Sequence, residues 1–234
     1  MQVIKMIVSS FYNTLINEEE AIPQSTMVEI ERIRKKGIIF VVATNRLYQE
    51  VLDYNIDFPF IDYIVSLNGS VVYDVQKRKI IHKKKMTEAS IKNISKLYEK
   101  DLITYYTAEA KNNYLDDLKE KNIYKIEIQT SEIKEKLKKI NVNTSFFKKD
   151  SKNYLEIISH KASMFNGIDQ IALKNNINLK EILVIAGNES DISMINNLKN
   201  SFVVENCAEL LKKTKAQKTS SNNQTGVENI LKEL

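Results

Sequence analysis

The stretch Val3–Leu15, VIKMIVSSFYNTL, decides the fold. Its apolar, β-branched run stops abruptly at small polar residues, which is typical of a buried strand that ends in a turn. Because ligands of parallel α/β sheets sit outside the carboxyl ends of the strands, Ser9 to Thr14 should lie where chemistry would occur. The turn contains no Asp, Glu or His and no glycine-rich loop. The sequence therefore predicts a site at this turn and lacks the usual reactive groups there.

Two further apolar stretches follow the same pattern. Ile38–Ala43 (IIFVVA) is nearly continuous in apolar residues, as a central parallel strand covered on both faces should be. Tyr63–Leu67 is a third such strand, and both strands end in short polar segments. Helices are predicted in between, over Ser25–Lys36 with Ser25 as its cap, and over Leu47–Tyr54. Strands with polar tips that alternate with helices predict an α/β fold with a doubly wound, Rossmann-like parallel sheet.

The pattern changes after residue 77. Val71–Tyr73 and Lys79–His82 are predicted as an antiparallel hairpin, and Thr87–Lys100 has its apolar residues on one helical stripe. Short strands are predicted at Ile103–Thr107, Tyr124–Gln129, Thr144–Phe147 and Tyr154–Ile157, with helical pieces near Leu115–Lys121 and Ser131–Lys139. This mixture predicts an α+β cap domain, residues 78–157, inserted into an α/β core made of residues 1–77 and 158–234.

From Met164 the first pattern resumes. The predicted elements are a helix over Asn166–Asn175, a strand over Ile182–Ile185, a helix beginning near Asp191, a strand over Phe202–Val204 and a helix over Val227–Leu234. The core is therefore completed by the C-terminal part of the chain.

The composition excludes several classes of protein. Apolar residues make up 43% and charged residues 28%, and no apolar run approaches the roughly 20 residues that cross a bilayer, so no membrane partner is expected. The single cysteine, Cys207, excludes an intramolecular disulfide and is typical of the cytoplasm, where we expect the protein. The formal charge is +5, but the densest basic run, Lys77–Lys85, has no aromatic residues for base stacking. We therefore expect no nucleic-acid partner.

Five segments together carry a resemblance to a known family: Ser10–Leu15, Ala43–Arg46, Asn68–Gly69, Leu155–Met164 and Ala186–Ile195. In their order and spacing the chain resembles the haloacid dehalogenase superfamily, and within it the Cof-type phosphatases that carry a large cap after the third core strand. The resemblance covers essentially the whole chain. It implies a capped α/β core and, in an intact member, Mg²⁺-dependent hydrolysis of small phosphorylated metabolites.

The two catalytic carboxylates that the resemblance implies are replaced. The family has a nucleophilic Asp at the end of the first strand and a second Asp, two residues on, that acts as acid and base; Ser10 and Tyr12 stand there. A serine without a base is a weak nucleophile, and a phenol with a pKa of about 10 is a weak base near neutral pH. We expect a packed, hydrogen-bonded strand end at these positions, with a rewired hydrolase as the alternative.

The family's phosphate-neutralising lysine and its metal site are also altered. Ungapped alignment puts Met164 at the lysine, with Lys161 three residues earlier as a candidate substitute. In the metal motif Gly187 replaces the first Asp, so Asp191 remains with Glu189 as its only acidic neighbour. Mg²⁺ prefers several oxygen ligands including carboxylates, so we expect a weak or absent site and no cofactor, with Asp191 as a helix cap.

The groups with which the family grips an anion are better kept. Thr44 matches the phosphate-binding hydroxyl at the second strand tip, and Arg46 matches the arginine that follows it, although Asn45 replaces a glycine. Asn68 keeps the Asn-Gly turn that leads to the cap. Thr44 and Arg46 have two open interpretations, namely anion binding and bracing of the turn.

These features predict a non-catalytic relative of a capped phosphatase, which binds a small anionic or phosphorylated ligand or acts as an interaction module. The alternative is a divergent Mg²⁺-dependent phosphatase of small metabolites such as sugar phosphates, with Lys161, Glu189 and Asp191 in displaced roles. Catalytic residues that act as a unit are not replaced independently, and four of them are changed here. The sequence therefore favours the non-catalytic interpretation.

Overall fold

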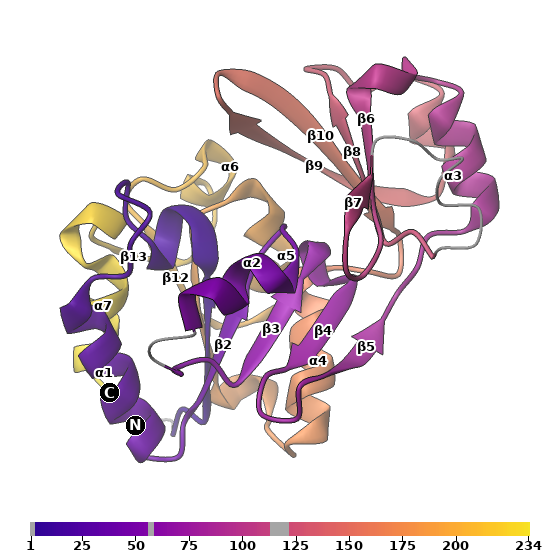
Figure 1. Ribbon diagram of the computed structural model, residues 1–234. Coiled ribbons are helices and arrows are strands. Elements are labelled where there is room, and N and C mark those ends of the chain that lie inside the picture. The colour runs from indigo at the N-terminus through magenta and orange to yellow at the C-terminus, as the bar shows by residue number, and fades with distance from the viewer. Residues whose placement is uncertain (1–2, 56–58, 113–121) are drawn as a thin grey trace.

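The computed structural model of this protein describes residues 3–55, 59–112 and 122–234, and these form two sheets with separate hydrophobic cores (Figure 1). The larger sheet has the strand order β13-β12-β11-β1-β2-β3-β4-β5. Its strands are β1 (Met6–Ser10), β2 (Ile39–Ala43), β3 (Tyr63–Ser66), β4 (Val71–Asp74), β5 (Lys79–Lys83), β11 (Ile182–Ala186), β12 (Asn200–Val204) and β13 (Gln217–Thr219). The predicted α/β class with a doubly wound sheet is confirmed.

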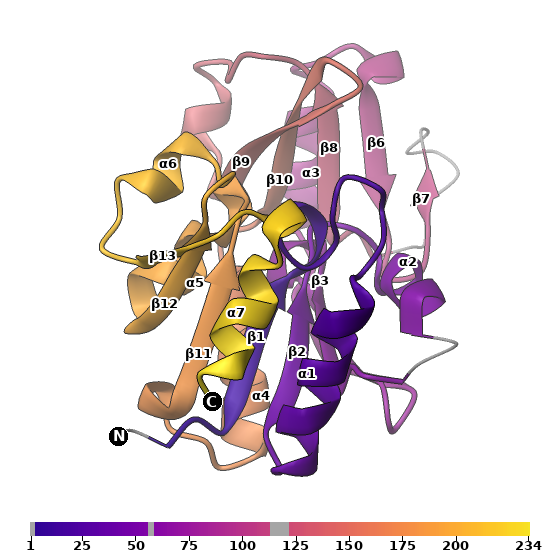
Figure 2. The ribbon, with the colours of Figure 1, turned by 90° about the vertical axis from the view of Figure 1, so that its left-hand side faces the viewer.

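The centre of this sheet is parallel and fully buried. β1 pairs in parallel with β2 on one side and β11 on the other, so the carboxyl ends of the three strands meet at one edge. Helices that pack on its strands are α1 (Gln24–Lys35), α2 (Tyr48–Leu52), α4 (Met164–Lys174), α5 (Ile192–Asn197) and α7 (Gly226–Lys232), whereas α6 (Glu209–Lys212) packs against α5. Figure 2 shows α1 and α7 side by side in front of the sheet and α4 behind it. Coverage on both faces explains the near-continuous apolar runs of the central strands.

The smaller, antiparallel sheet belongs to the cap. Its order is β7-β6-β8-β10-β9, with β6 (Ile103–Tyr106), β7 (Lys111–Asn112), β8 (Lys125–Gln129), β9 (Val142–Lys149) and β10 (Lys152–Ser159). Helix α3 (Glu88–Ser95) contributes Ile91 and Ile94 to the core of this domain. The predicted division of core and cap at residues 77/78 and 157/158 stays a prediction. Strand β5, which follows the first of these boundaries, pairs with β4 and so belongs to the larger sheet.

Some local predictions differ from the structure. Ser25 does not cap α1, which begins at Gln24 after Pro23; its hydroxyl instead donates to Glu228 Oε2 at 2.5 Å. The helix predicted over Ser131–Lys139 is reduced to a single 3-10 turn, Leu137–Lys139, of which only Leu137 is buried. The helical piece predicted at Leu115–Lys121 lies outside the described residues.

The helices within residues 3–55, 59–112 and 122–234 do not include a membrane span. Each is too short or too polar to cross a bilayer.

Candidate functional site

The tip of β1 is closed from solvent. Ser10, its last residue, is 0% exposed, and the turn Phe11–Leu15 folds back over it. Asn13 has a φ of 58° in this turn, a left-handed conformation that asparagine adopts more readily than most residues. The sequence thus forms the sharp turn that would present a nucleophile at the sheet edge, with a serine in that place.

A buried hydrogen-bond cluster joins the tips of β1 and β11. The Ser10 hydroxyl donates to Asp191 Oδ2 at 2.5 Å, and the same oxygen accepts the backbone N–H groups of Gly187 at 3.0 Å and Asn188 at 2.8 Å. Asp191 is 1% exposed, and burial raises the pKa of its carboxyl group despite these donors. Asp191 stands at the N-cap position of α5, as predicted, but its side chain makes no cap bond there and instead accepts the Asn188 N–H at the start of the preceding 3-10 turn, Glu189–Asp191.

These residues do not fit the magnesium ion that the family implies. A Cβ atom on Gly187 would lie 2.4 Å from Thr14 Oγ1 and 2.8 Å from the Asn13 carbonyl oxygen, so an aspartate cannot enter without moving the turn. Asp191 already faces three N–H or O–H donors, whereas Mg²⁺ requires a near-octahedral set of oxygen ligands. Within residues 3–55, 59–112 and 122–234, no group of three or more His, Cys, Asp or Glu side chains is placed to hold a metal.

Tyr12, at the acid/base position, is held as a neutral phenol. Burial raises the pKa of Tyr12 to about 12, and the Arg46 charge lowers it only in part. The Arg46 guanidinium carbon lies 3.7 Å from the centre of the Tyr12 ring, and its Nη1 lies 3.6 Å from Glu50 Oε2. A group that keeps its proton until far above neutral pH is a poor general base.

The start of α4, where the family's lysine would lie, is apolar and capped from within. Met164 is buried, the Ser163 hydroxyl accepts the Asn166 N–H at 3.1 Å, and the Ser193 hydroxyl accepts the Phe165 N–H at 3.3 Å. An anion therefore finds little unpaired N–H at this helix start. Lys161 is exposed, and its ammonium group forms no hydrogen bond or ion pair with any described residue.

The two residues kept at the second strand tip brace their own turn. Thr44 is buried, and its hydroxyl accepts the Arg46 N–H at 3.1 Å. Asn68, at the tip of β3, has a φ of 55° and directs its amide toward the cap rather than toward Ser10. Glu189 accepts the Phe146 N–H of β9 at 3.1 Å and so joins the core to the cap.

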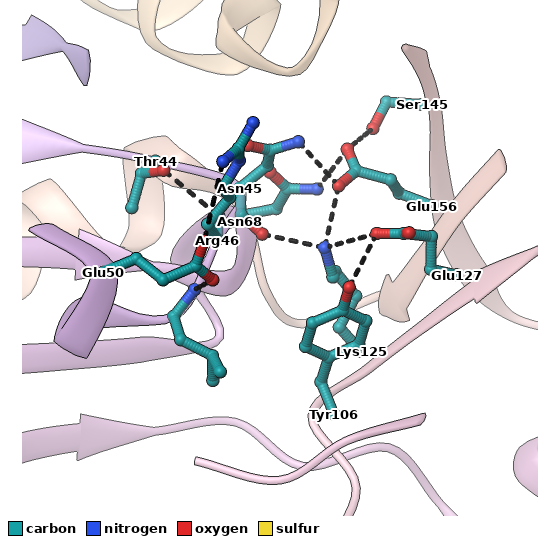
Figure 3. Close-up of polar contacts among 11 residues, drawn as sticks. Thr44, Asn45, Arg46, Glu50, Asn68, Tyr106, Lys125, Glu127, Ser145 and Glu156 are labelled. Atoms are coloured by element: carbon teal, nitrogen blue, oxygen red, sulfur yellow. Dashed lines mark hydrogen bonds and ion pairs between the residues drawn. The ribbon is translucent and has the colours of Figure 1, made fainter. Parts of the chain in front are cut away.

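A buried charge network between cap and core has no counterpart in the sequence prediction (Figure 3). Lys125 of β8 is fully buried, and its ammonium group donates to the Asn45 carbonyl oxygen at 2.8 Å, to Glu156 at 3.0 Å and to Glu127 at 3.2 Å. Burial alone would lower the pKa of Lys125, but the charges of Glu156 and Glu127 hold it above its ordinary value. The centre of the Tyr106 ring lies 4.1 Å from the ammonium nitrogen and closes the network on the cap side.

Glu156, of β10, is the centre of this network. Beside Lys125, its carboxylate accepts the side-chain amides of Asn45 and Asn68, each at 2.9 Å, and the Ser145 hydroxyl at 3.2 Å. Two of these four donors belong to the core and two to the cap. Both carboxylate oxygens of Glu156 are therefore saturated, as a buried charge requires.

Two cavities lie between core and cap near the strand tips, and Glu189 and Ser190 line both of them. The Tyr12 cavity, about 540 Å³, is lined by Tyr12, Arg46, Phe146, Phe147, Lys148 and Lys149, with the acidic residues Glu18, Glu20 and Glu189 also at its wall. The Asn143 cavity, about 590 Å³, is lined by serine and asparagine side chains that include Asn143 and Ser145 of β9 and Ser193 of α5, together with apolar residues such as Met164 of α4. Ser10, Thr44 and Asp191 line neither cavity.

A doubly wound sheet with an α+β cap over its strand tips defines a capped α/β protein. The chain belongs to the haloacid dehalogenase-like hydrolases, because the model of that family matches residues 7–141 and 116–231.

Individual relatives agree with this assignment. A 5-amino-6-(5-phospho-D-ribitylamino)uracil phosphatase of Bacillus subtilis is 20% identical over 96% of this chain and 93% of its own length. The structure of a haloacid dehalogenase-like hydrolase from B. subtilis superposes with a TM-score of 0.86 at 18% identity, covering 99% of this chain and 100% of that one. A subclass IIB sugar phosphatase of the same superfamily gives 0.80 at 18% identity, with 98% of both chains covered. The fold predicted from the sequence resemblance is thereby confirmed.

Proposed function

We propose that this chain is a non-catalytic member of its family, which binds a small anionic or phosphorylated metabolite in the Tyr12 cavity. The first part of the proposal, the absence of catalysis, is supported by the closed cluster of Ser10, Gly187 and Asp191. In it a neutral hydroxyl donates to the one remaining carboxylate, and a glycine leaves no room for the second. An aspartyl-phosphate route needs a carboxylate nucleophile at this strand tip, and the turn supplies none.

The same cluster supports the proposal that the protein uses no magnesium. A cation at this position would have to displace the Ser10 hydroxyl and two backbone N–H groups from Asp191. Glu189 does not replace the missing ligand, because its carboxylate is hydrogen-bonded to Phe146 of the cap. We therefore propose no metal-assisted step for this chain.

The second half of the proposal rests on the wall of the Tyr12 cavity. Arg46, Lys148 and Lys149 contribute three cationic groups, and Phe147, whose ring stacks on Tyr154, offers apolar contact beside them. The three carboxylates at the same wall balance this charge, so we expect moderate affinity that depends on contact with the aromatic side chains as well as on charge. A small phosphorylated metabolite with an apolar or planar part fits this combination.

A divergent phosphatase is the second candidate function. It is favoured by the names of the relatives, one of which acts as a phosphatase on a phosphorylated ribitylaminouracil. Its catalytic groups would have to be Glu189, Asp191 and Lys161. Of these, Asp191 is buried, Glu189 is hydrogen-bonded to the cap and Lys161 is exposed away from both cavities, which supports the non-catalytic alternative.

We also propose that the protein acts in the cytoplasm without nucleic-acid or membrane partners. The single cysteine, Cys207, is buried, which suits a protein that is not exposed to an oxidising compartment. The basic run Lys77–Lys85 includes the edge strand β5, and lysines are a common protection of an exposed sheet edge.

Binding is tested by titration calorimetry with a panel of sugar phosphates, nucleoside monophosphates and p-nitrophenyl phosphate. We expect saturable binding of at least one member, weakened about fivefold or more in Lys148→Gln/Lys149→Gln, since about 1 kcal/mol of charge attraction is lost. Lys138→Gln/Lys139→Gln is the matched control, because it removes the same charge from exposed residues of the cap outside the cavity. Equal affinities in both variants, or no binding by any member, would contradict the proposal.

A further inference from the structure

Both walls of the Tyr12 cavity are attached to the same buried carboxylate. On the core side, Asn45 donates its side-chain amide to Glu156 and is followed directly by Arg46. On the cap side, Ser145 donates its hydroxyl to Glu156 and is followed directly by Phe146. The distance between the two walls is therefore governed by a residue that does not line the cavity.

Lys125 fixes this carboxylate in place and reaches across to the core. Its three N–H groups are all used, one by the Asn45 carbonyl oxygen and two by the carboxylates of Glu127 and Glu156. The two glutamates face each other directly across the β8–β10 pair, so without the ammonium group two negative charges would meet in a buried place. The three charged groups of the network therefore pair within the cap, and the core adds the Asn45 carbonyl oxygen and the side-chain amides of Asn45 and Asn68.

The network also occupies the space next to the strand tips. Lys125 contacts the backbone at Asn45, and the Phe146 N–H reaches Glu189 beside the closed Ser10 cluster. Separation of cap and core would break the hydrogen bonds by which Asn45 and Asn68 of the core hold Lys125 and Glu156 of the cap. Each of these three bonds involves a charged group, and such bonds contribute more than neutral ones, so the separated state is disfavoured.

We propose that Lys125 and Glu156 are positioning residues which lock the cap on the core, so that the Tyr12 cavity keeps its shape and is entered without cap opening. The ligand of this cavity rests on the proposed function, but the lock does not, because it consists of contacts within the chain alone. A protein whose cap is locked on the core binds its ligand in a preformed cavity. Binding then does not include the free-energy cost of ordering two domains around the ligand.

The lock is tested first by hydrogen exchange at the Phe146 amide, which bridges cap and core. We expect this amide to exchange at least tenfold faster in Lys125→Met than in the wild type, while the exposed Lys138→Met, which removes a partner of Glu135, leaves the rate unchanged. Lys125→Met/Glu156→Gln, which removes the excess negative charge, should recover part of the protection. Equal Phe146 exchange in Lys125→Met and the wild type overturns the proposal.

A second measurement needs no variant of the network, and so remains decisive where Lys125→Met fails to fold. Spin labels at Glu132 in the cap and Lys199 in the core, both exposed, are placed in a Cys207→Ser background. We expect one narrow distance distribution, unchanged by inorganic phosphate. A second population at longer distance, which phosphate depletes, would show an opening cap and overturn the lock. Failure of phosphate to bind would affect only the proposed function, since the distribution without phosphate already tests the lock.

Discussion

The two buried polar clusters of this protein, one at the strand tips and one between cap and core, differ in their charge. At the strand tips a single carboxylate, Asp191, is surrounded by neutral donors. Between cap and core the ammonium group of Lys125 lies between Glu127 and Glu156. Buried charge is therefore concentrated where the domains meet and is sparse where the family performs chemistry. We infer from this difference that the buried charged groups of this chain serve to hold its two domains together.

The largest expected effect comes from breaking the charged cluster. Lys125→Met leaves Glu127 and Glu156 facing each other without a cation, and removal of one partner from a buried pair costs about 3–5 kcal/mol. Urea unfolding should show this loss, whereas Lys138→Met on the cap surface should change the free energy of unfolding by less than about 1 kcal/mol. Similar losses in the two variants would mean that the buried network does not stabilise the fold.

The next effect concerns the neutral cluster. Gly187→Asp restores the family's carboxylate but brings a side chain against Thr14 and the Asn13 carbonyl, and overpacking of this kind costs about 1–3 kcal/mol. We expect a lower melting temperature that Mg²⁺ does not restore. A rise of several degrees on addition of Mg²⁺, absent in the wild type, would mean that the strand tip still accommodates the metal.

A smaller loss is expected from Ser10→Ala. The change removes one of three donors to Asp191, and a hydrogen bond to a charged group contributes about 1.5–3 kcal/mol. The loss should lie at the lower end of this range, because the two backbone N–H groups remain. Calorimetric unfolding checks the value, with Ser9→Ala as a control, since among the described residues the Ser9 hydroxyl bonds only to the adjacent Ser10 carbonyl oxygen.

The smallest effect is a pH dependence that separates the two clusters. Burial raises the pKa of Asp191 above its unfolded value of about 3.9, so the neutral form stabilises the fold. This contribution is complete below pH of about 3.9 and is lost as the pH rises through the raised folded value. Asp191→Asn should therefore gain stability relative to the wild type as the pH rises across that window, which urea unfolding at several pH values would measure. A constant difference would contradict the burial argument.

The fold could be predicted from the sequence because its main signal is local. Ile38–Ala43 and Ile182–Ile185 are apolar throughout, as strands covered on both faces must be, and each ends in a polar tip. The helix predicted over Ser131–Lys139 failed because a charged stretch with apolar residues at helical spacing needs a surface to pack on. Here only Leu137 is buried, so the segment forms one turn.

The replacement of the family's aspartates by Ser10 and Gly187 could also be predicted, because each position lies at the end of a strand that the sequence identifies. The role of Asp191 could not, because a carboxylate before a helix has the same local pattern whether it caps the helix or accepts the Ser10 hydroxyl. That choice depends on the contact between β1 and β11. Ser10 at the end of β1 and Ile182 at the start of β11 are 172 residues apart in the sequence.

The charge network was missed for a related reason. In β8, Lys125 and Glu127 alternate with Ile126 and Ile128, so the strand has one apolar and one polar face. A polar face ordinarily points to solvent. Here it lies against the core instead, which follows from the docking of two domains and not from the strand itself.

The central claim is that the strand tip performs no phosphoryl chemistry, and a hydrolysis assay tests it most directly. The purified chain is incubated with p-nitrophenyl phosphate and sugar phosphates in the presence of Mg²⁺, beside the Thr44→Ala/Arg46→Ala variant. We predict phosphate release at the rate of the protein-free control in both samples. Release well above that rate in the wild type, abolished in the variant and dependent on Mg²⁺, would contradict the account.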